Sequence, residues 1–335
     1  MARRTPRPSR RLSRRWRACR PRRSNNRRGA AQRSRRGSIL KAIPTIDGHH
    51  HIWRLNDLTW LSGPEVPRIF GSYGPIRRDY PIDEFLADTA GCNVVKSVYV
   101  QTNWPPGKSY DEARWVQSVI DQHGWPHANV AHADLADPEC EVLIERLAAL
   151  PATRGIRQQL HWHQNLQYRF ASRPDVMNDG VWRRGLSLLS KYNLLFELQV
   201  FADQMQDGAA LARAFPETIF VLEHAGMPED LSEDGWKKWR AGMSALAEQP
   251  NVNVKLSGLG TFVRGCRADL MTSIIRETVA IFGADRCLYG SNFPIEKLWT
   301  DYATLYGTFR EAIDGLDPRQ QRAILHDTAA RLYRI

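Results

Sequence analysis

Three consecutive histidines, His49–His51, end a short apolar segment with the sequence TIDGHHHIW. Side chains alternate between the two faces of an extended strand, so we expect His49 and His51 to point one way and His50 to point the other way. Two neutral imidazoles on one face can bind a divalent metal or transfer protons near neutral pH. The spacing therefore predicts a site that contains His49 and His51.

Polar residues also end seven later apolar segments of the chain. A polar side chain is costly to bury without a partner, so residues at such positions are candidates for a shared site rather than for the core. They are Gln101, Asp134, Arg157, Gln158, Gln199, Glu223, His224, Lys255 and Asn292.

The elements that would position these residues follow a regular alternation from residue 43 onward. Predicted strands cover residues 43–53, 94–101, 129–135, 154–160, 194–200, 219–226, 252–258 and 287–292. Predicted helices cover residues 82–91, 110–123, 138–150, 180–192, 204–214, 235–248, 269–283, 301–314 and 317–332. Eight strand–helix pairs predict an α/β fold of the (β/α)₈ or TIM-barrel type, whose active site lies at the carboxyl ends of the strands. An open doubly wound sheet is the alternative, but the chain has no GxGxxG or P-loop motif.

The amino-terminal segment has a different composition. Residues 1–36 contain 16 arginines and no acidic residue, whereas the whole chain has a net charge of +11, so the remainder is acidic. We expect a disordered basic extension over residues 1–40 and a barrel domain over residues 41–335. The extension could contact nucleic acid or an anionic membrane, or have no function. The acidic domain argues against nucleic acid as its substrate.

Two further features limit the class of protein. No apolar run approaches the roughly 20 residues that span a bilayer. The five cysteines are scattered without CxxC spacing, which indicates neither a disulfide framework nor a zinc–cysteine site. We therefore expect a cytoplasmic protein with no membrane partner. The sequence does not indicate an oligomeric state.

Short motifs in a fixed order resemble the amidohydrolase superfamily. These are HxH on the first predicted strand, HAG at the end of the sixth and GSNFP at the end of the eighth, supported by GIRQ, FELQVF, NVKLSG and HDTAARLYRI across residues 43–335. The chain is similar to the amidohydrolase-related branch that contains L-fuconolactonase, L-rhamnonolactonase and 2-pyrone-4,6-dicarboxylate lactonase. The resemblance implies a TIM-barrel hydrolase that opens a lactone or related cyclic ester, of the sugar-acid or pyrone type.

The resemblance also implies roles for individual residues. The expected catalytic residues are His49, His51, His224 and Asn292. The expected substrate-binding residues are Arg157, Gln199, Lys255 and Trp53.

Asn292 departs from the family pattern, which commonly has an aspartate there as metal ligand and base. An amide neither accepts a proton at neutral pH nor binds metal well. His49, His51 and His224 could hold one divalent metal, with zinc the expected ion and water in its fourth position. The alternative is a metal-independent enzyme.

Other groups could then activate water. His224 or a metal-bound hydroxide is the first candidate, and Glu296 in the following loop is the next. We expect Glu223 to point away from His224, because neighbouring strand residues alternate, and Asp47 to lie on the face of His49 but deeper in the barrel.

Two other functions remain open at this point. The first is metal-dependent non-oxidative decarboxylation, which normally requires the strand-eight carboxylate. The second is a catalytically weakened barrel that binds a sugar acid.

Overall fold

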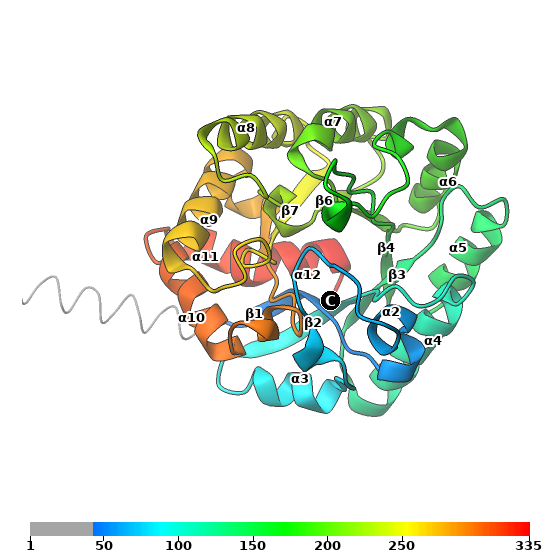
Figure 1. Ribbon diagram of the computed structural model, residues 1–335, viewed down its shortest axis with the longest axis horizontal. Helices are drawn as coiled ribbons and strands as arrows, with labels where there is room; N and C mark the ends of the chain where they lie inside the picture. Colours follow the sequence, from blue (N-terminus) through cyan, green and yellow to red (C-terminus); the bar gives the residue numbers. More distant parts are fainter. Residues whose placement is uncertain (1–42) are drawn as a thin grey trace, which may run out of the picture.

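The computed structural model describes residues 43–335, which form a ring of parallel strands surrounded by helices (Figure 1). The eight strands pair in chain order, each with the next. They are β1 (Thr45–His50), β2 (Val94–Val100), β3 (Ala128–His132), β4 (Thr153–Arg157), β5 (Leu195–Leu198), β6 (Phe220–Leu222), β7 (Val252–Leu256) and β8 (Cys287–Tyr289). The predicted TIM barrel is confirmed. The predicted basic extension, residues 1–40, lies outside the described part of the chain.

Hydrogen bonds beyond the last strand bring the two ends of the sheet together. The His51 amide donates to the Phe293 carbonyl at 2.7 Å, and the Asn292 amide donates to the His49 carbonyl at 2.7 Å. The first and last predicted site segments are therefore neighbours, although about 240 residues separate them in the sequence.

Most of the helices follow the strands and cover the outside of the ring, whereas the last one packs against one end of the barrel. They are α2 (Thr59–Ser62), α3 (Ile82–Asp88), α4 (Ser109–His123), α5 (Cys140–Ala148), α6 (Gly180–Lys191), α7 (Met205–Ala214), α8 (Glu233–Ala247), α9 (Ala268–Phe282), α10 (Tyr302–Ile313), α11 (Pro318–Arg322) and α12 (Thr328–Tyr333). Side-chain caps begin several of them: Asp179 accepts from the Val181 amide at 2.7 Å, and Asp301 accepts from the Thr304 amide at 2.7 Å. No helix within residues 43–335 is long and apolar enough to cross a membrane.

Two apolar layers hold the barrel together. The larger layer packs the helices against the outside of the strands, and buried aromatic residues such as Phe85, Trp182 and Trp239 belong to it. The smaller layer fills the barrel itself and includes strand residues such as Val98 and Val221.

Helix α12 also packs into this inner layer and lies at the centre of the ring in Figure 1. The Arg154 side chain, near the start of β4, donates to the Tyr333 carbonyl at 2.9 Å. Helix α12 therefore closes the amino-terminal end of the barrel. The carboxyl ends of the strands, where the active site of such a barrel lies, are at the opposite end.

Candidate active site

A cavity opens at the carboxyl ends of the strands, with about 620 Å³ of space that is continuous with solvent. Six of the eight predicted site residues line it: His51, Trp53, Arg157, Gln199, His224 and Asn292. The other two, His49 and Lys255, are fully buried and are not among its lining residues. The expected position of Lys255 at the mouth is therefore corrected, because this side chain lies behind the cavity wall.

A β-bulge in β1 decides where its polar residues point. Asp47 pairs with Ser97 and His50 with Tyr99, so three steps along β1 match two along β2. Gly48 stands in the bulge, where a Cβ atom would lie 2.8 Å from both the Leu288 side chain and the Tyr289 carbonyl oxygen. Only glycine fits this close approach.

The bulge places Asp47 and His49 on different faces of β1. Asp47 faces away from the cavity, where it accepts hydrogen bonds from the Ser291 amide at 2.8 Å and the Tyr302 hydroxyl at 3.0 Å. The expectation that Asp47 shares the face of His49 is wrong, because strict alternation does not hold through a bulge. The outward direction of His50 is confirmed, since its ring stacks on Phe85 at 3.8 Å.

The three predicted histidines converge. The ring centroid of His49 lies 5.0 Å from that of His51 and 4.7 Å from that of His224. His51 is held at Nδ1 by the Val100 carbonyl at 2.7 Å, and His224 at Nδ1 by the Ser257 hydroxyl at 2.9 Å. Both histidines therefore keep Nε2 available for other partners.

All three histidines are neutral at physiological pH. Burial and, to a smaller extent, the neighbouring Arg157 guanidinium lower the pKa of His51 and of His224 to about 3. Burial and the charge of Lys255 hold the pKa of His49 well below its usual range. Neutral imidazoles can accept hydrogen bonds from water or substrate, and because this environment disfavours the imidazolium form, a proton that either ring takes up is held only weakly.

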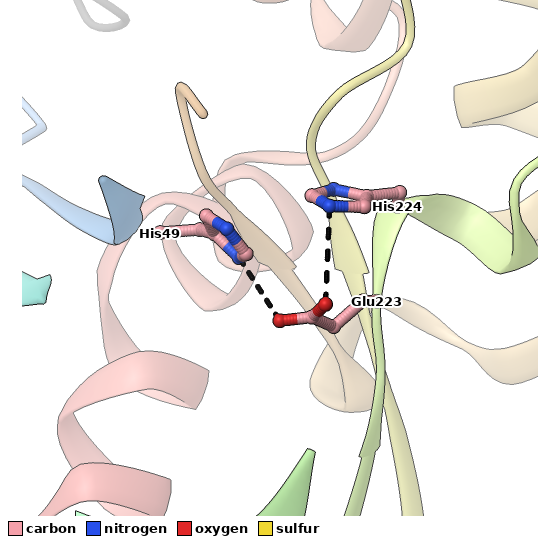
Figure 2. A group of neighbouring side chains, drawn as sticks. All are labelled: His49, Glu223 and His224. Carbon is pink, nitrogen blue, oxygen red and sulfur yellow. Dashed lines mark ion pairs between the residues drawn. The ribbon is translucent and has the colours of Figure 1, made fainter. Parts of the chain in front are cut away.

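Glu223 lies among these histidines rather than away from them. Its carboxylate oxygens lie 3.4 Å from His49 Nδ1 and 3.9 Å from His224 Nε2 (Figure 2). It also forms an ion pair with Arg157 at 3.1 Å. The expected alternation fails because His224 adopts φ +55°, in the left-handed region, so the chain leaves the strand direction between the two residues.

Glu197 on β5 is a buried site residue that sequence reasoning missed. It accepts hydrogen bonds from Lys255 at 2.5 Å and from the Tyr333 hydroxyl at 2.6 Å. Burial raises the pKa of this carboxyl group and lowers that of the Lys255 ammonium group, while their mutual attraction opposes both shifts. One signal could have found it, namely a single acidic residue inside the apolar segment LLFELQV.

Asn292 lies between His51 and Glu296. Its side chain interacts with the His51 ring and with the Glu296 carboxyl group. Glu296 is fully buried, does not line the cavity, and accepts a hydrogen bond from Trp299 at 2.7 Å. Burial raises the pKa of Glu296 to about 7. Glu296, the second candidate for activating water, therefore does not reach the cavity and lies behind Asn292.

The remaining lining side chains shape the cavity wall. Trp53 donates from its indole nitrogen to the Arg78 carbonyl at 2.8 Å, and its ring packs against Trp60 with centroids 6.1 Å apart. Gln199 lies 3.4 Å from the sulfur of Met227. Two aromatic rings and an amide give the wall both apolar surface and hydrogen-bonding capacity, which is typical of sites for small polar molecules.

A group of potential metal ligands comprises His49, Glu223 and His224, whose candidate ligand atoms lie within 4.8 Å of one another (Figure 2). Glu223 thus takes the place that was expected for His51. Imidazole and carboxylate are ligand types that zinc accepts. However, Arg157 already pairs with Glu223, and Lys255 Nζ lies 3.4 Å from His49 Nδ1. A divalent cation at these atoms would face two positive charges at close range, so the residues do not fit it.

The chain is similar to known proteins over nearly all of its described residues. A family model described as amidohydrolase matches residues 46–335. An uncharacterised protein of Sinorhizobium fredii is 35% identical over 88% of this chain and 100% of its own length. An L-fucono-1,5-lactonase of Burkholderia ambifaria is 27% identical over 87% of this chain and 95% of its own length.

A solved structure is similar over the same region. It is an amidohydrolase from Burkholderia multivorans crystallised with bound zinc, with a TM-score of 0.73 and 26% identity over 87% of this chain and 99% of that one. The sequence matches and the shared fold together cover the whole barrel. The chain therefore belongs to the amidohydrolase family.

Proposed function

We propose that this protein is a hydrolase that opens a lactone or a related cyclic ester by attack of water in the cavity. The observation that carries this proposal is the meeting of two neutral histidines, His51 and His224, with the Arg157 guanidinium in one cavity. The similarity to L-fucono-1,5-lactonases supports this reaction class, since those relatives match over nearly their full length.

Arg157 is the proposed electrophilic group. Its guanidinium is fixed by Glu223 and by the Gln101 carbonyl, which accepts from Nη2 at 2.5 Å. A fixed cation beside the cavity can stabilise the negative charge that develops on a lactone carbonyl oxygen during attack. Because Glu223 and Gln101 hold the group before substrate binds, the reaction needs little reorganisation.

His224 is the proposed base. Ser257 holds its Nδ1, so Nε2 is the nitrogen that can take a proton from water as the water oxygen bonds to the carbonyl carbon. The Glu223 carboxylate, 3.9 Å away, would stabilise the resulting imidazolium ion. The ring carbon–oxygen bond then breaks, and the leaving oxygen takes the proton back from His224.

His51 and Asn292 are proposed to position the substrate or the attacking water, and Gln199 and Trp53 to bind the rest of the substrate. No step is assigned to a metal ion, because Arg157 and Lys255 contact the candidate ligands. In this scheme the guanidinium supplies the positive charge that a metal would otherwise provide.

A panel of sugar-acid and pyrone lactones, followed by acid release in a weakly buffered indicator solution, tests this function. We expect a hydrolysed substrate in the panel and a loss of about 10²–10⁴-fold in kcat for His224→Ala. Tyr302→Phe, which removes a hydrogen bond to the outward-facing Asp47, serves as the control and should retain activity. Hydrolysis that survives His224→Ala unchanged would contradict the assignment of the base.

A further inference from the structure

A continuous buried network runs from the last helix to the first strand. The Tyr333 hydroxyl on α12 donates to Glu197 at 2.6 Å, and Lys255 on β7 donates to the other oxygen of Glu197 at 2.5 Å. The same Lys255 nitrogen lies 3.4 Å from His49 Nδ1. All four side chains are fully buried. We refer to Tyr333, Glu197 and Lys255 as the Lys255 network.

Burying such a network at the centre of a barrel has a high cost in desolvation free energy. Removing two charges from water costs more than their attraction usually returns, and apolar side chains of similar volume are often at least as stable. The inner layer around it is otherwise built from valine, leucine, isoleucine and alanine. Stability alone therefore gives no reason for an ion pair here, and its contact with His49 indicates a role in the site.

A hydrogen bond between Lys255 and His49 can run in one direction only. An ammonium group has three hydrogen-bond donors and no acceptor, so Lys255 can only donate to His49. A neutral imidazole carries one proton, and a nitrogen that accepts a hydrogen bond cannot hold it. With Nδ1 accepting from Lys255, the proton of His49 must be on Nε2.

A second neighbour of His49 Nδ1 favours the other position of the proton. Glu223 Oε1 also lies 3.4 Å from His49 Nδ1, and a carboxylate can only accept. Without Lys255, the favoured arrangement would place the proton on Nδ1, where it would be donated to Glu223. The two partners therefore favour opposite tautomers of His49.

We propose that the Lys255 network selects the tautomer of His49 that carries its proton on Nε2, and so makes His49 a hydrogen-bond donor in the active site. His49 Nε2 has no hydrogen-bond partner among residues 43–335. An unsatisfied buried N–H is costly. The His49 ring packs against the rings of His51 and His224, which line the cavity, so we expect this N–H to be satisfied in the space that the three rings share, by a substrate oxygen that enters between His51 and His224. Lys255, Glu197 and Tyr333 are positioning residues that act through His49.

This assignment gives the closing helix a role in the site at the opposite end of the barrel. The Tyr333 hydroxyl donates a hydrogen bond that fixes the Glu197 carboxylate, and Glu197 in turn fixes the ammonium group of Lys255. The Lys255 nitrogen also lies 5.5 Å from the centroid of the Tyr333 ring, which favours a cation at that position.

The test is direct observation of the tautomer in the full-length protein labelled with ¹⁵N-histidine. Long-range ¹H–¹⁵N correlation distinguishes a protonated Nε2 from a protonated Nδ1, and the signals of His49 are identified by their loss in His49→Gln. We expect the Nε2–H form in the unmodified protein and the Nδ1–H form in Lys255→Met. An Nδ1–H signal in the unmodified protein overturns the proposal without any variant, and so does a tautomer that does not change in Lys255→Met.

Kinetic measurements give a second readout, which rests on the proposed lactone hydrolysis. Losing one properly placed donor to the developing oxyanion typically costs about 10²–10³-fold in kcat, so Lys255→Met should lose that much with little change in KM. Tyr333→Phe should lose about tenfold in kcat, since Lys255 remains in place. Equal activity of Tyr333→Phe and the unmodified protein would remove α12 from the proposal.

Thr45→Val is the matched control, because it removes a buried 2.6 Å hydrogen bond to Tyr306 on the outward side of the same strand. Its histidine spectrum and kcat should equal those of the unmodified protein, and a tautomer change there would show that the readout reports general damage to β1. If no lactone is hydrolysed by any form, the proposed function fails while the tautomer measurement still decides this inference.

Discussion

Replacing Glu223 by glutamine should lower the free energy of unfolding far more than the same replacement of a surface glutamate that pairs with similar basic side chains. Glu223 is fully buried and pairs with Arg157, which is 4% exposed. Glutamine keeps the shape but removes the charge, and the guanidinium of Arg157 then stays buried without a counterion. Breaking a buried pair in this way typically costs about 3–5 kcal/mol.

Glu84 offers the matched comparison in the same chain. It pairs with Arg78 at 2.6 Å and with Lys297 at 2.7 Å, closer contacts than those of Glu223. However, its partners are 47% and 28% exposed, so water screens the charges. We expect Glu84→Gln to cost about 1 kcal/mol or less.

Urea unfolding at pH 7, followed by circular dichroism, measures both differences. The expected result is a loss of about 3–5 kcal/mol for Glu223→Gln against about 1 kcal/mol or less for Glu84→Gln. A domain is typically stable by about 5–15 kcal/mol, so the Glu223 variant should remain folded without denaturant. Equal losses for the two variants would refute the argument that burial, rather than contact distance, determines how much each ion pair contributes to the free energy of unfolding.

Three further predictions follow from the site. Burial raises the pKa of Glu296 from 4.5 to about 7, so the folded state retains a proton that the unfolded state loses. Stability should therefore fall as pH rises between those values, and Glu296→Gln should reduce this fall by about 2–4 kcal/mol in urea unfolding, whereas an unchanged pH profile would contradict it. Asn292→Asp adds a second carboxyl group beside Glu296, so we expect higher zinc affinity but no gain in kcat; a hundredfold gain that follows zinc uptake would restore the metal mechanism. Dialysis against a chelator should leave hydrolysis within about twofold, because Arg157 supplies the positive charge, and a loss that zinc reverses would disprove this.

The sequence by itself predicted the architecture. Alternating apolar and amphipathic segments predicted eight strand–helix units, and the barrel follows from that pattern because parallel strands need crossover helices. Polar residues at strand ends also indicated where chemistry would lie, since strand ends meet at one rim. Six of the eight predicted site residues line a single cavity for this reason.

The directions of individual side chains were decided only by the tertiary structure. The bulge at Gly48 depends on Leu288 and Tyr289 from the far end of the chain, and it separates Asp47 from His49. The left-handed turn at His224 likewise brings Glu223 into the site. Both depend on contacts between distant segments, and a local pattern of alternation contains no information about them.

The partners of buried charges were equally beyond the reach of the sequence. Glu197 meets Tyr333 across 136 residues and Lys255 across 58 residues. Composition and periodicity report how often a residue type recurs along the chain, whereas an ion pair or a tautomer depends on which atoms lie within about 3 Å after folding. The sequence therefore determined which residue types reach the barrel rim, and the closed barrel determined which of them touch.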